Sequence, residues 1–461
     1  MRHTTRLLDI LDRIETGPIV EESEWDMLQV PGALAALQIE YEIDFKALGQ
    51  TLIPADDALA DRVFAAGLAL AEQLGVYCVS TSRQIKFSRE EILTALAVAP
   101  LEVTLGEGLD RHTERKRRPE DPNPPTIKGG GVGTPLPEEI YLAVHQAYAQ
   151  EPLIDAVINC TLSHVYGREL RSRSPWEILA GWHEVELTKS AARRAGRPGL
   201  ALGCVENAVS ELAELSATSY GGFSRFDWHH IAMISEFKTD YGLLTKLAHL
   251  IKTDSLIHAF YNPIYGGSVG GAEGVAVAIV GGCILLHMVY MTNTHSVSPA
   301  HPFFDNNTTP EIIRAISVAQ QALARNSRLL TDVVVTPVGG PGTATLLYEA
   351  AAMAVMATAS GACGLIGPRS AAGIHPGHVS GLEARWLAEV AHAAAGLTRP
   401  EADALVRQLV ALYQADLEQR PIGQPFPAVY DLTTLKPRPA WQALYEEVKA
   451  EVSHLGLKIG D

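Results

Sequence analysis

From residue 125 onward, short apolar segments alternate with amphipathic helical segments, and this rhythm restricts the fold of the 461-residue chain more than any other feature. Eightfold βα alternation with apolar strands is typical of an α/β TIM (β/α)8 barrel, and a doubly wound open sheet is the alternative. The expected strands are residues 126–128, 156–160, 200–202, 228–234, 256–261, 289–294, 332–336 and 364–367. The expected helices are residues 138–149, 175–195, 208–216, 241–251, 271–287, 310–324, 343–360 and 381–395.

We expect three regions along the chain. Residues 1–124 show helical apolar periodicity and are predicted to form an N-terminal helical extension. Residues 125–396 are predicted to form the barrel, and residues 397–461 a C-terminal helical cap. Within the first region, residues 111–123 combine a run of charges with prolines, and we interpret them as a solvated linker rather than a binding patch.

The acidic composition excludes some partners. The formal net charge is −16, whereas binding to nucleic acid or to an anionic membrane depends on a basic surface. The charged first residues lack the apolar core of a signal peptide, so we expect a cytoplasmic protein. The cysteines are widely spaced and show no zinc-ligand pattern, so we expect reduced thiols and no bound metal. They are Cys78, Cys160, Cys204, Cys283 and Cys363.

Residues 274–291 form an apolar run that is nearly long enough to span a bilayer. Paired glycines, the internal His287 and a polar continuation at residues 292–295 favour a buried barrel helix that leads into a strand. We therefore expect no membrane span.

Glu206 is the first candidate for an active-site group. It follows a tight turn at residues 196–199 and a short apolar strand, and it lies just past the end of that strand. TIM barrels carry their chemistry at the carboxyl ends of the strands. Glu206 could instead cap the next helix, and the pattern leaves both interpretations open.

Two glycine-rich loops are candidates for cofactor binding. Gly129 and Gly130 open the first, and Gly339 and Gly340 open the second. Backbone N–H groups in such loops can hold an anion or let a bulky planar partner approach closely. Neither loop has the spacing of a P-loop or of a dinucleotide fold, so the pattern favours simple turn geometry over either binding role.

His229 and His230 could provide a proton carrier, because imidazole titrates near neutral pH. Successive strand residues face opposite sides, so at most one of the two can face the barrel interior. We favour His230 as the catalytic group, and a packed histidine pair is the alternative.

Aromatic residues near two strand ends could form a wall for a methylated cation. They are Trp228, Phe260, Tyr261 and Tyr265. A structural role in the core is the alternative. Four further residues at strand ends complete the predicted substrate site, namely Asn293, His295, Val334 and Thr336.

Several motifs resemble those of the monomethylamine:corrinoid methyltransferase family. The similarity extends over nearly the whole chain. The motifs are residues 115–118 (RKRR), Gly129-Gly130, residues 196–199 (GRPG), Glu206, residues 263–267 (PIYGG), Pro337 with Gly340-Pro341, and residues 381–385 (GLEAR). The resemblance implies a TIM barrel that passes a methyl group to the Co(I) corrinoid (cobalamin) of a separate partner protein. It also implies a homo-oligomer, with no cofactor bound tightly by this chain.

The resemblance also implies that the site has changed. In the family, three apolar residues follow the GRPG motif and a catalytic pyrrolysine comes directly after them, and the matching position here is Gly203. The family's neighbouring acidic residues match His230 and Phe260, and its nearby Gln and Tyr match Val334 and Thr336. Glu206 is retained.

We therefore expect a methyltransferase that works without pyrrolysine. Its substrate is expected to be a small N-methylated compound that is larger than methylamine. The removal of a large side chain at Gly203 is expected to leave room for that donor, which Glu206 and His230 would orient or protonate. The alternatives are a pterin-dependent barrel methyltransferase, a non-catalytic docking scaffold for a corrinoid protein, and retained activity on monomethylamine.

Overall fold

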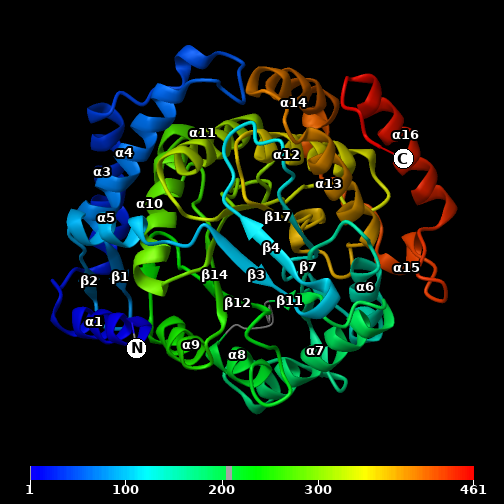
Figure 1. Ribbon diagram of the computed structural model, residues 1–461, viewed down its shortest axis with the longest axis horizontal. Coiled ribbons are helices and arrows are strands. Elements are labelled where there is room, and N and C mark those ends of the chain that lie inside the picture. Colours follow the sequence, from blue (N-terminus) through cyan, green and yellow to red (C-terminus); the bar gives the residue numbers. More distant parts are fainter. Residues whose placement is uncertain (1, 204–209, 461) are drawn as a thin grey trace.

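Eight parallel strands close into a barrel at the centre of the molecule (Figure 1). The computed structural model describes residues 2–203 and 210–460. The strands, in chain order, are β5 (Thr126–Gly130), β7 (Ala156–Ile158), β11 (Ala201–Gly203), β12 (Trp228–Ala232), β14 (Leu256–Tyr261), β15 (Thr294–Val297), β16 (Thr331–Val334) and β17 (Gly364–Gly367). Strand β17 pairs with β5, and β7 pairs with both β5 and β11, so the sheet has no edge. This closure confirms the predicted TIM barrel and excludes the open sheet.

A ring of helices surrounds the barrel, as the sequence rhythm predicts (Figure 1). The helices are α6 (Glu138–Ala149), α7 (Pro175–Arg194), α8 (Glu211–Ala217), α9 (Tyr241–Lys252), α10 (Ala272–Tyr290), α11 (Pro310–Asn326), α12 (Ala344–Ala359) and α13 (Gly381–Ala394). Their apolar faces pack on the outside of the sheet in one continuous core. A second, smaller cluster fills the barrel interior and includes Trp228, Ile158 and Ile366.

The strand predicted at residues 289–294 is in the wrong place. Val289 and Tyr290 are β-formers, yet they continue helix α10, where both are fully buried and the Tyr290 hydroxyl donates to Thr239 Oγ1 at 2.8 Å. The chain turns at Met291, whose φ is 53°, and the strand begins only at Thr294. Tertiary packing therefore outweighs the local preference.

Helix α10 is long and apolar enough to cross a bilayer, but 94% of its most apolar stretch of 18 residues is buried inside the protein. It packs against α4 (Asp57–Leu74) on one side and against β14 and β15 on the other. A helix that is buried between two layers must be apolar on every face.

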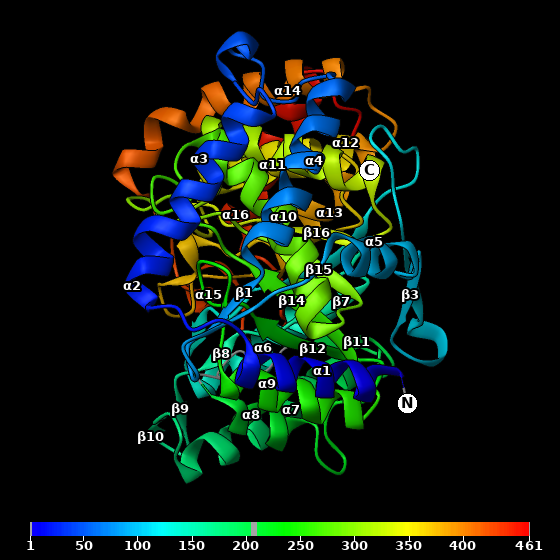
Figure 2. The same cartoon turned by 90° about the vertical axis from the view of Figure 1, so that its left-hand side faces the viewer.

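The N-terminal region contains helices and two small β elements. Its helical segments are α1 (Arg2–Thr16), α2 (Glu22–Glu24), the π-helical η1 (Trp25–Gln29), α3 (Val30–Glu40), α4 and α5 (Arg89–Ala97). Strand β1 (Val76–Cys78) pairs with β2 (Arg83–Ile85) and with β13 (Lys238–Thr239), which follows a barrel strand. Figure 2 shows these helices along one side of the barrel.

A β-hairpin closes the amino-terminal end of the barrel and corrects the interpretation of residues 111–123 as a solvated linker. It consists of β3 (Glu102–Leu105) and β4 (His112–Arg115), and it crosses the barrel in Figure 1. Leu105 belongs to the interior cluster, and the side chain of Glu114 is fully buried. The charges in this segment serve internal contacts, because Lys116 donates to the carbonyl of Leu329 and Arg117 to that of Ala362.

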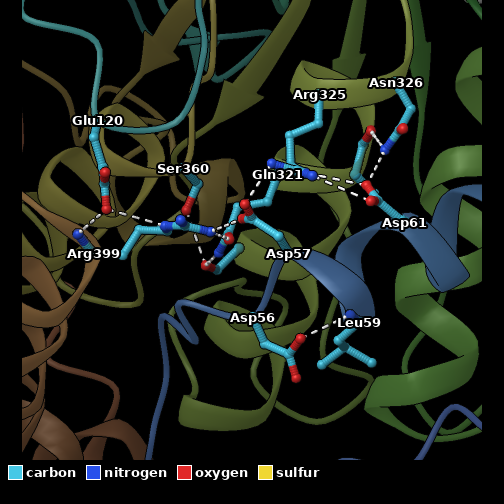
Figure 3. Close-up of polar contacts among 12 residues, drawn as sticks. Asp56, Asp57, Leu59, Asp61, Glu120, Gln321, Arg325, Asn326, Ser360 and Arg399 are labelled. Carbon is cyan, nitrogen blue, oxygen red and sulfur yellow. Dashed lines mark hydrogen bonds and ion pairs between the residues drawn. The ribbon is translucent and has the colours of Figure 1, made fainter.

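A network of ion pairs joins the N-terminal region, the barrel and the C-terminal region (Figure 3). Arg399, at the start of α14 (Arg399–Tyr413), contacts Asp57 of α4 at 2.7 Å and Glu120 at 3.1 Å. Arg325 of α11 contacts Asp57 at 2.7 Å and Asp61 at 3.1 Å. The C-terminal region continues with α15 (Phe426–Val429) and α16 (Pro439–His454). The division into residues 1–124, 125–396 and 397–461 stays a prediction.

Buried histidines predict how stability depends on pH. Burial, and then the neighbouring imidazole of His287, lowers the pKa of His295 to about 3, although its hydrogen bond to the carbonyl of Leu330 acts in the opposite direction. In the neutral ring, Nδ1 donates to that carbonyl and Nε2 accepts from the Thr292 hydroxyl. As the pH falls below about 6.5, residue 295 takes up a proton in the unfolded chain but not in the folded protein. Its contribution to stability is therefore complete above about pH 6.5 and is lost as the pH falls towards the folded pKa.

We expect the loss in unfolding free energy between pH 7.5 and 5.5 to be smaller in His295→Asn than in the wild type, by about 1.4 kcal/mol. Urea unfolding at both pH values measures this difference. The variant must be compared with the wild type, because burial also raises the pKa of Glu349 and Glu383 to about 7. These two carboxyl groups increase the stability of the folded protein as the pH falls, which is opposite to the effect of His295. His454→Asn, at an exposed position, is the control and should keep the wild-type slope. Equal slopes in all three proteins would contradict the assignment.

Candidate active site at the mouth of the barrel

A cavity of about 360 Å³ lies at the carboxyl ends of the strands, and we call it the mouth cavity. Seven of the eight strands, or the loops that follow them, contribute to its lining, and the eighth strand, β11, leads into residues outside the described ranges. The described lining residues are Val132, Gly133, Ile158, His230, Ala232, His258, Phe260, Asn262, Ser298, Pro299, Ala300, Asp305, Asn306, Val334, Thr336, Ile366 and Arg369. Four predicted site residues are among them, namely His230, Phe260, Val334 and Thr336.

The alternation of strand β12 separates the two adjacent histidines. His229 is fully buried outside the barrel, where its Nδ1 lies 2.9 Å from Glu214 Oε1 and its Nε2 2.8 Å from the carbonyl of Ser224. His230 faces the mouth cavity. The structure thus brings His230 into the candidate site and gives His229 a structural environment.

The predicted aromatic wall does not form. Phe260 lines the mouth cavity, but Tyr261 points to the outside of the barrel, where its hydroxyl donates to Glu236 at 2.6 Å and its ring packs against helix α10. Trp228 lies deeper in the barrel, and its ring faces the ammonium of Lys128 at 3.7 Å. That face of Trp228 is therefore occupied by an internal cation and not open to a ligand.

Asn293 and His295 also lie away from the mouth, because strand β15 begins later than the sequence predicts. Asn293 precedes the strand, and its Oδ1 accepts from the backbone N–H of Ile257 at 2.8 Å. His295 points outward, with its ring 5.4 Å from that of His287 of α10. The side chains of β15 that face inward are Thr294 and Ser296, which both contact His258.

Tyr265 lies beside the mouth rather than in its lining. Its ring stacks on His301 at 5.6 Å, and His301 in turn stacks on Phe304 at 4.6 Å. Phe303 is 72% exposed. These residues form an aromatic rim, which we define as Tyr265, His301, Phe303 and Phe304, next to the cavity-lining residues Ala300 and Asp305.

The four glycines predicted to bind a cofactor pack against the protein itself and do not line the cavity. A Cβ at Gly129 would meet Ile154 at 2.3 Å, and one at Gly130 would meet the carbonyl of Ile158 at 1.9 Å. In the second loop, the lack of a Cβ lets Gly339 approach α12 and lets Gly340 approach the backbone of residue 422. They are glycines because neighbouring segments pass close by.

Gly203 faces the barrel interior, but the space beside it is filled. A Cβ at this position would lie 2.2 Å from Cβ of Trp228, 3.0 Å from its Cγ and 3.2 Å from its Cα. Gly203 and Trp228 are register partners on adjacent parallel strands. The expectation of vacated room at Gly203 is thus wrong, because Trp228 occupies it and the mouth cavity lies beyond. Glu206 falls outside the described residues, so its role stays a prediction.

A buried charge cluster lies beneath the mouth cavity. Lys128 Nζ contacts Asp332 Oδ2 at 2.5 Å and Glu114 Oε2 at 2.8 Å, and all three side chains are fully buried. Burial, together with the nearby Asp332 carboxylate, raises the pKa of Glu114 well above its usual range, so one proton stays within the cluster. Lys128 is therefore part of the floor beneath the mouth cavity and not of its lining.

The polar lining residues that sequence reasoning missed include His258, Ser298 and Asn306. His258 lies two positions before Phe260 and therefore shares its face of strand β14, so strict alternation could have found it. Ser298 follows the misplaced strand β15, and Asn306 lies in a loop without a sequence signal.

Hydrogen bonds connect Asn306 to the next loop of the mouth. The Asn306 amide donates to Thr308 at 2.7 Å, and Thr308 donates to Glu349, which also accepts from the backbone of Val338 and Gly339. This chain of contacts fixes two loops of the mouth.

A larger cavity of about 800 Å³ lies between α1, α5 and the end of α10, and Asn293 contributes to it. It lies beside the region where β15 begins, so the inward-facing groups of the strands do not converge on it. The mouth cavity is the better candidate on that ground. Among the described residues, no group of three His, Cys, Asp or Glu side chains could hold a metal ion, and the four described cysteines are buried and not disulfide-bonded.

A closed (β/α)8 barrel with convergent polar groups at its carboxyl end defines the class of TIM-barrel enzymes. A family model described as monomethylamine methyltransferase MtmB matches residues 5–457. Monomethylamine methyltransferase MtmB2 of Methanosarcina acetivorans and MtmB1 of Methanosarcina barkeri are each 31% identical over 449 residues, which is 97% of both chains in each pair. The crystal structure of the Methanosarcina barkeri monomethylamine methyltransferase superposes with a TM-score of 0.95 at 30% identity, over 98% of each chain. A hydroxylamine complex of MtmB matches equally well.

The chain belongs to the MtmB family. It is therefore a methyltransferase, and the predicted resemblance is confirmed.

Proposed function

We propose that this protein moves a methyl group from a small, N-methylated compound in the mouth cavity to the Co(I) corrinoid of a partner protein, without pyrrolysine. The contact between Gly203 and Trp228 carries the proposal. Relatives are named for their activity on monomethylamine, whereas here the position matched to pyrrolysine has neither a side chain nor space for one. The donor must then be positioned by the groups that line the cavity.

The lining is suited to a methylated nitrogen compound of moderate size. Apolar side chains of Ile158, Phe260 and Val334 form one part of it, and polar side chains form the other. In the reaction, the bond between the methyl carbon and nitrogen breaks and its electron pair stays on nitrogen. The imidazole of His230 can supply a proton to that nitrogen, as a general acid does. Glu206 keeps its sequence-based assignment as a group that orients or protonates the donor.

The corrinoid would be held by the partner and would supply its reduced cobalt as the nucleophile. The aromatic rim fits such a group, because one exposed ring and three half-buried rings beside the cavity can pack against a flat macrocycle. In this arrangement the residues of the chain hold the donor below the rim and exclude water from it. We further propose a cytoplasmic homo-oligomer, in line with the acidic composition and the family.

The rim assignment predicts a specific defect. Phe303→Ser is expected to raise the KM for the corrinoid protein by about fivefold, because one stacked ring contributes about 1 kcal/mol. Phe303 is 72% exposed, so the fold should be unaffected. Tyr220→Ser is the control, since Tyr220 is 98% exposed in the loop that enters the opposite end of β12. Equal KM values for Phe303→Ser and the wild type would contradict the rim assignment.

The test of the function is donor-dependent methylation of a Co(I) corrinoid by the purified protein, followed by the visible spectrum of cobalt. The donor panel should contain mono-, di- and trimethylamine, quaternary N-methyl compounds and N-methyl amino acids. We expect transfer from a donor larger than monomethylamine. Transfer from monomethylamine alone would identify the family's named activity, methylation of tetrahydrofolate without corrinoid protein would identify the pterin alternative, and partner binding without any transfer would identify a scaffold. Each of these results would overturn the proposal.

A further inference from the structure

The mouth cavity contains two imidazoles with different surroundings. The rings of His230 and His258 lie 5.9 Å apart and nearly parallel, at an angle of 29°. Two like charges at this distance in a partly closed cavity repel each other, so only one ring is readily protonated. The surroundings of each ring decide which one it is.

His258 lines the cavity but is almost entirely buried. It is 3% exposed, its Nδ1 lies 2.8 Å from Thr294 Oγ1, and its Nε2 lies 2.6 Å from Ser296 Oγ. Trp228 meets it edge-on, with ring centroids 4.8 Å apart. A hydroxyl can donate or accept, so a neutral ring is fully satisfied in either tautomer.

Described charged and titratable groups face His258 from the surrounding strands. They are Lys128 of β5, His230 of β12 and Asp332 of β16, and His295 of β15 acts on His258 from the outer side of the sheet. Burial, then the Lys128 ammonium and the other two histidines, holds the pKa of His258 well below its usual range. Asp332 lies 3.8 Å from Nδ1, but its Oδ2 is already engaged by Lys128 at 2.5 Å. At 3.8 Å, Asp332 Oδ2 is too far from Nδ1 for a hydrogen bond, and the Lys128 ammonium beside it offsets the charge of the carboxylate.

We propose that His258 is a positioning residue, held as a neutral imidazole by Thr294, Ser296 and the Lys128 cluster, so that His230 is the histidine of the mouth that carries the exchangeable proton. His258 then acts through its neighbour. As a neutral ring it packs below His230 without competing for the proton, and it places no second positive charge beside a donor nitrogen. The inference rests on the proposed function only in treating the mouth cavity as the donor site.

Histidine-selective NMR of the whole protein tests this without any donor. With ¹³C-labelled histidine, His230→Gln and His258→Gln assign the two Cε1–H signals. We expect the His258 signal to stay constant from pH 8 to pH 5.5 while the His230 signal shifts. A His258 signal that titrates with a midpoint above pH 6 would overturn the inference, and the wild-type spectrum alone decides this. Because no methyl transfer is involved, failure here is distinguishable from failure of the proposed function.

Two further measurements separate positioning from simple packing. In folded Lys128→Met, the His258 signal should begin to titrate within the same range, since the nearest fixed cation is gone; an unchanged signal would contradict the role of Lys128. In methyl transfer, His258→Asn is expected to lower kcat by about tenfold or more, while the alkaline limb of the pH profile, the fall in rate as His230 loses its proton, remains. His230→Asn is expected to remove that limb. Loss of the limb in His258→Asn would contradict the assignment.

Discussion

His230→Gln is expected to lower the rate of methyl transfer by about 10² to 10⁴, the range typical for loss of a general acid. Glutamine keeps a similar length and a hydrogen-bonding group but cannot supply a proton near neutral pH. Since His230 is part of the cavity lining and not of the outer core, the fold should persist. Single-turnover methylation of a Co(I) corrinoid measures the effect.

The matched control for this change is His454→Gln, at an exposed position on α16. It should keep the wild-type rate. A rate for His230→Gln within about twofold of wild type would remove His230 from the chemistry and leave the mouth cavity without a described proton donor.

Gly203→Ala is expected to lower the free energy of unfolding by about 2–3 kcal/mol, as overpacking of a closed interior does. The added methyl group would lie 2.2 Å from Cβ of Trp228 and 3.2 Å from its Cα, so no side-chain rotation relieves the contact. The backbone of β11 or β12 must move instead. Urea unfolding measures the loss.

Two further variants test whether this loss of stability comes from the contact with Trp228. Gly32→Ala is the control, because a Cβ at Gly32 in helix α3 meets nothing within 4 Å, and alanine there should be neutral or slightly stabilising. In a Trp228→Gly background, the cost of Gly203→Ala should fall by more than 1 kcal/mol, since contacting residues do not add independently. An equal cost in both backgrounds would show that Trp228 does not occupy the space beside residue 203.

Much of the fold follows from the sequence because buried parallel strands and amphipathic helices leave strong local patterns. Seven of the eight expected strands overlap an observed strand well, whereas β15 was displaced because Val289 and Tyr290 are β-formers that tertiary contacts hold in a helix. The hairpin that closes the barrel could not be recognised. The charges beside it, Lys116 and Arg117, imitate a solvated segment, and the carbonyls of Leu329 and Ala362 to which they donate lie more than 200 residues away in the chain.

The candidate site was predictable where a single strand decides the direction of a side chain. Alternation places His230 and Phe260 in the cavity, and it excludes His229 and Tyr261. What alternation cannot give is the depth of a residue along the barrel axis. Trp228 faces inward like His230, yet it lies a layer lower, where Lys128 and Gly203 contact it. The filled space at Gly203 is therefore a property of packing and not of the motif.

The most direct measurement of the central claim is methyl transfer in the presence of hydroxylamine, a reagent that adds to imines. In the proposed reaction the donor lies in the mouth cavity, and residue 203, a glycine, provides no imine. The proposed function therefore predicts that the purified protein methylates a Co(I) corrinoid at an unchanged rate and that its intact mass shows no adduct. Inhibition that rises in step with a covalent hydroxylamine adduct on the chain would contradict it.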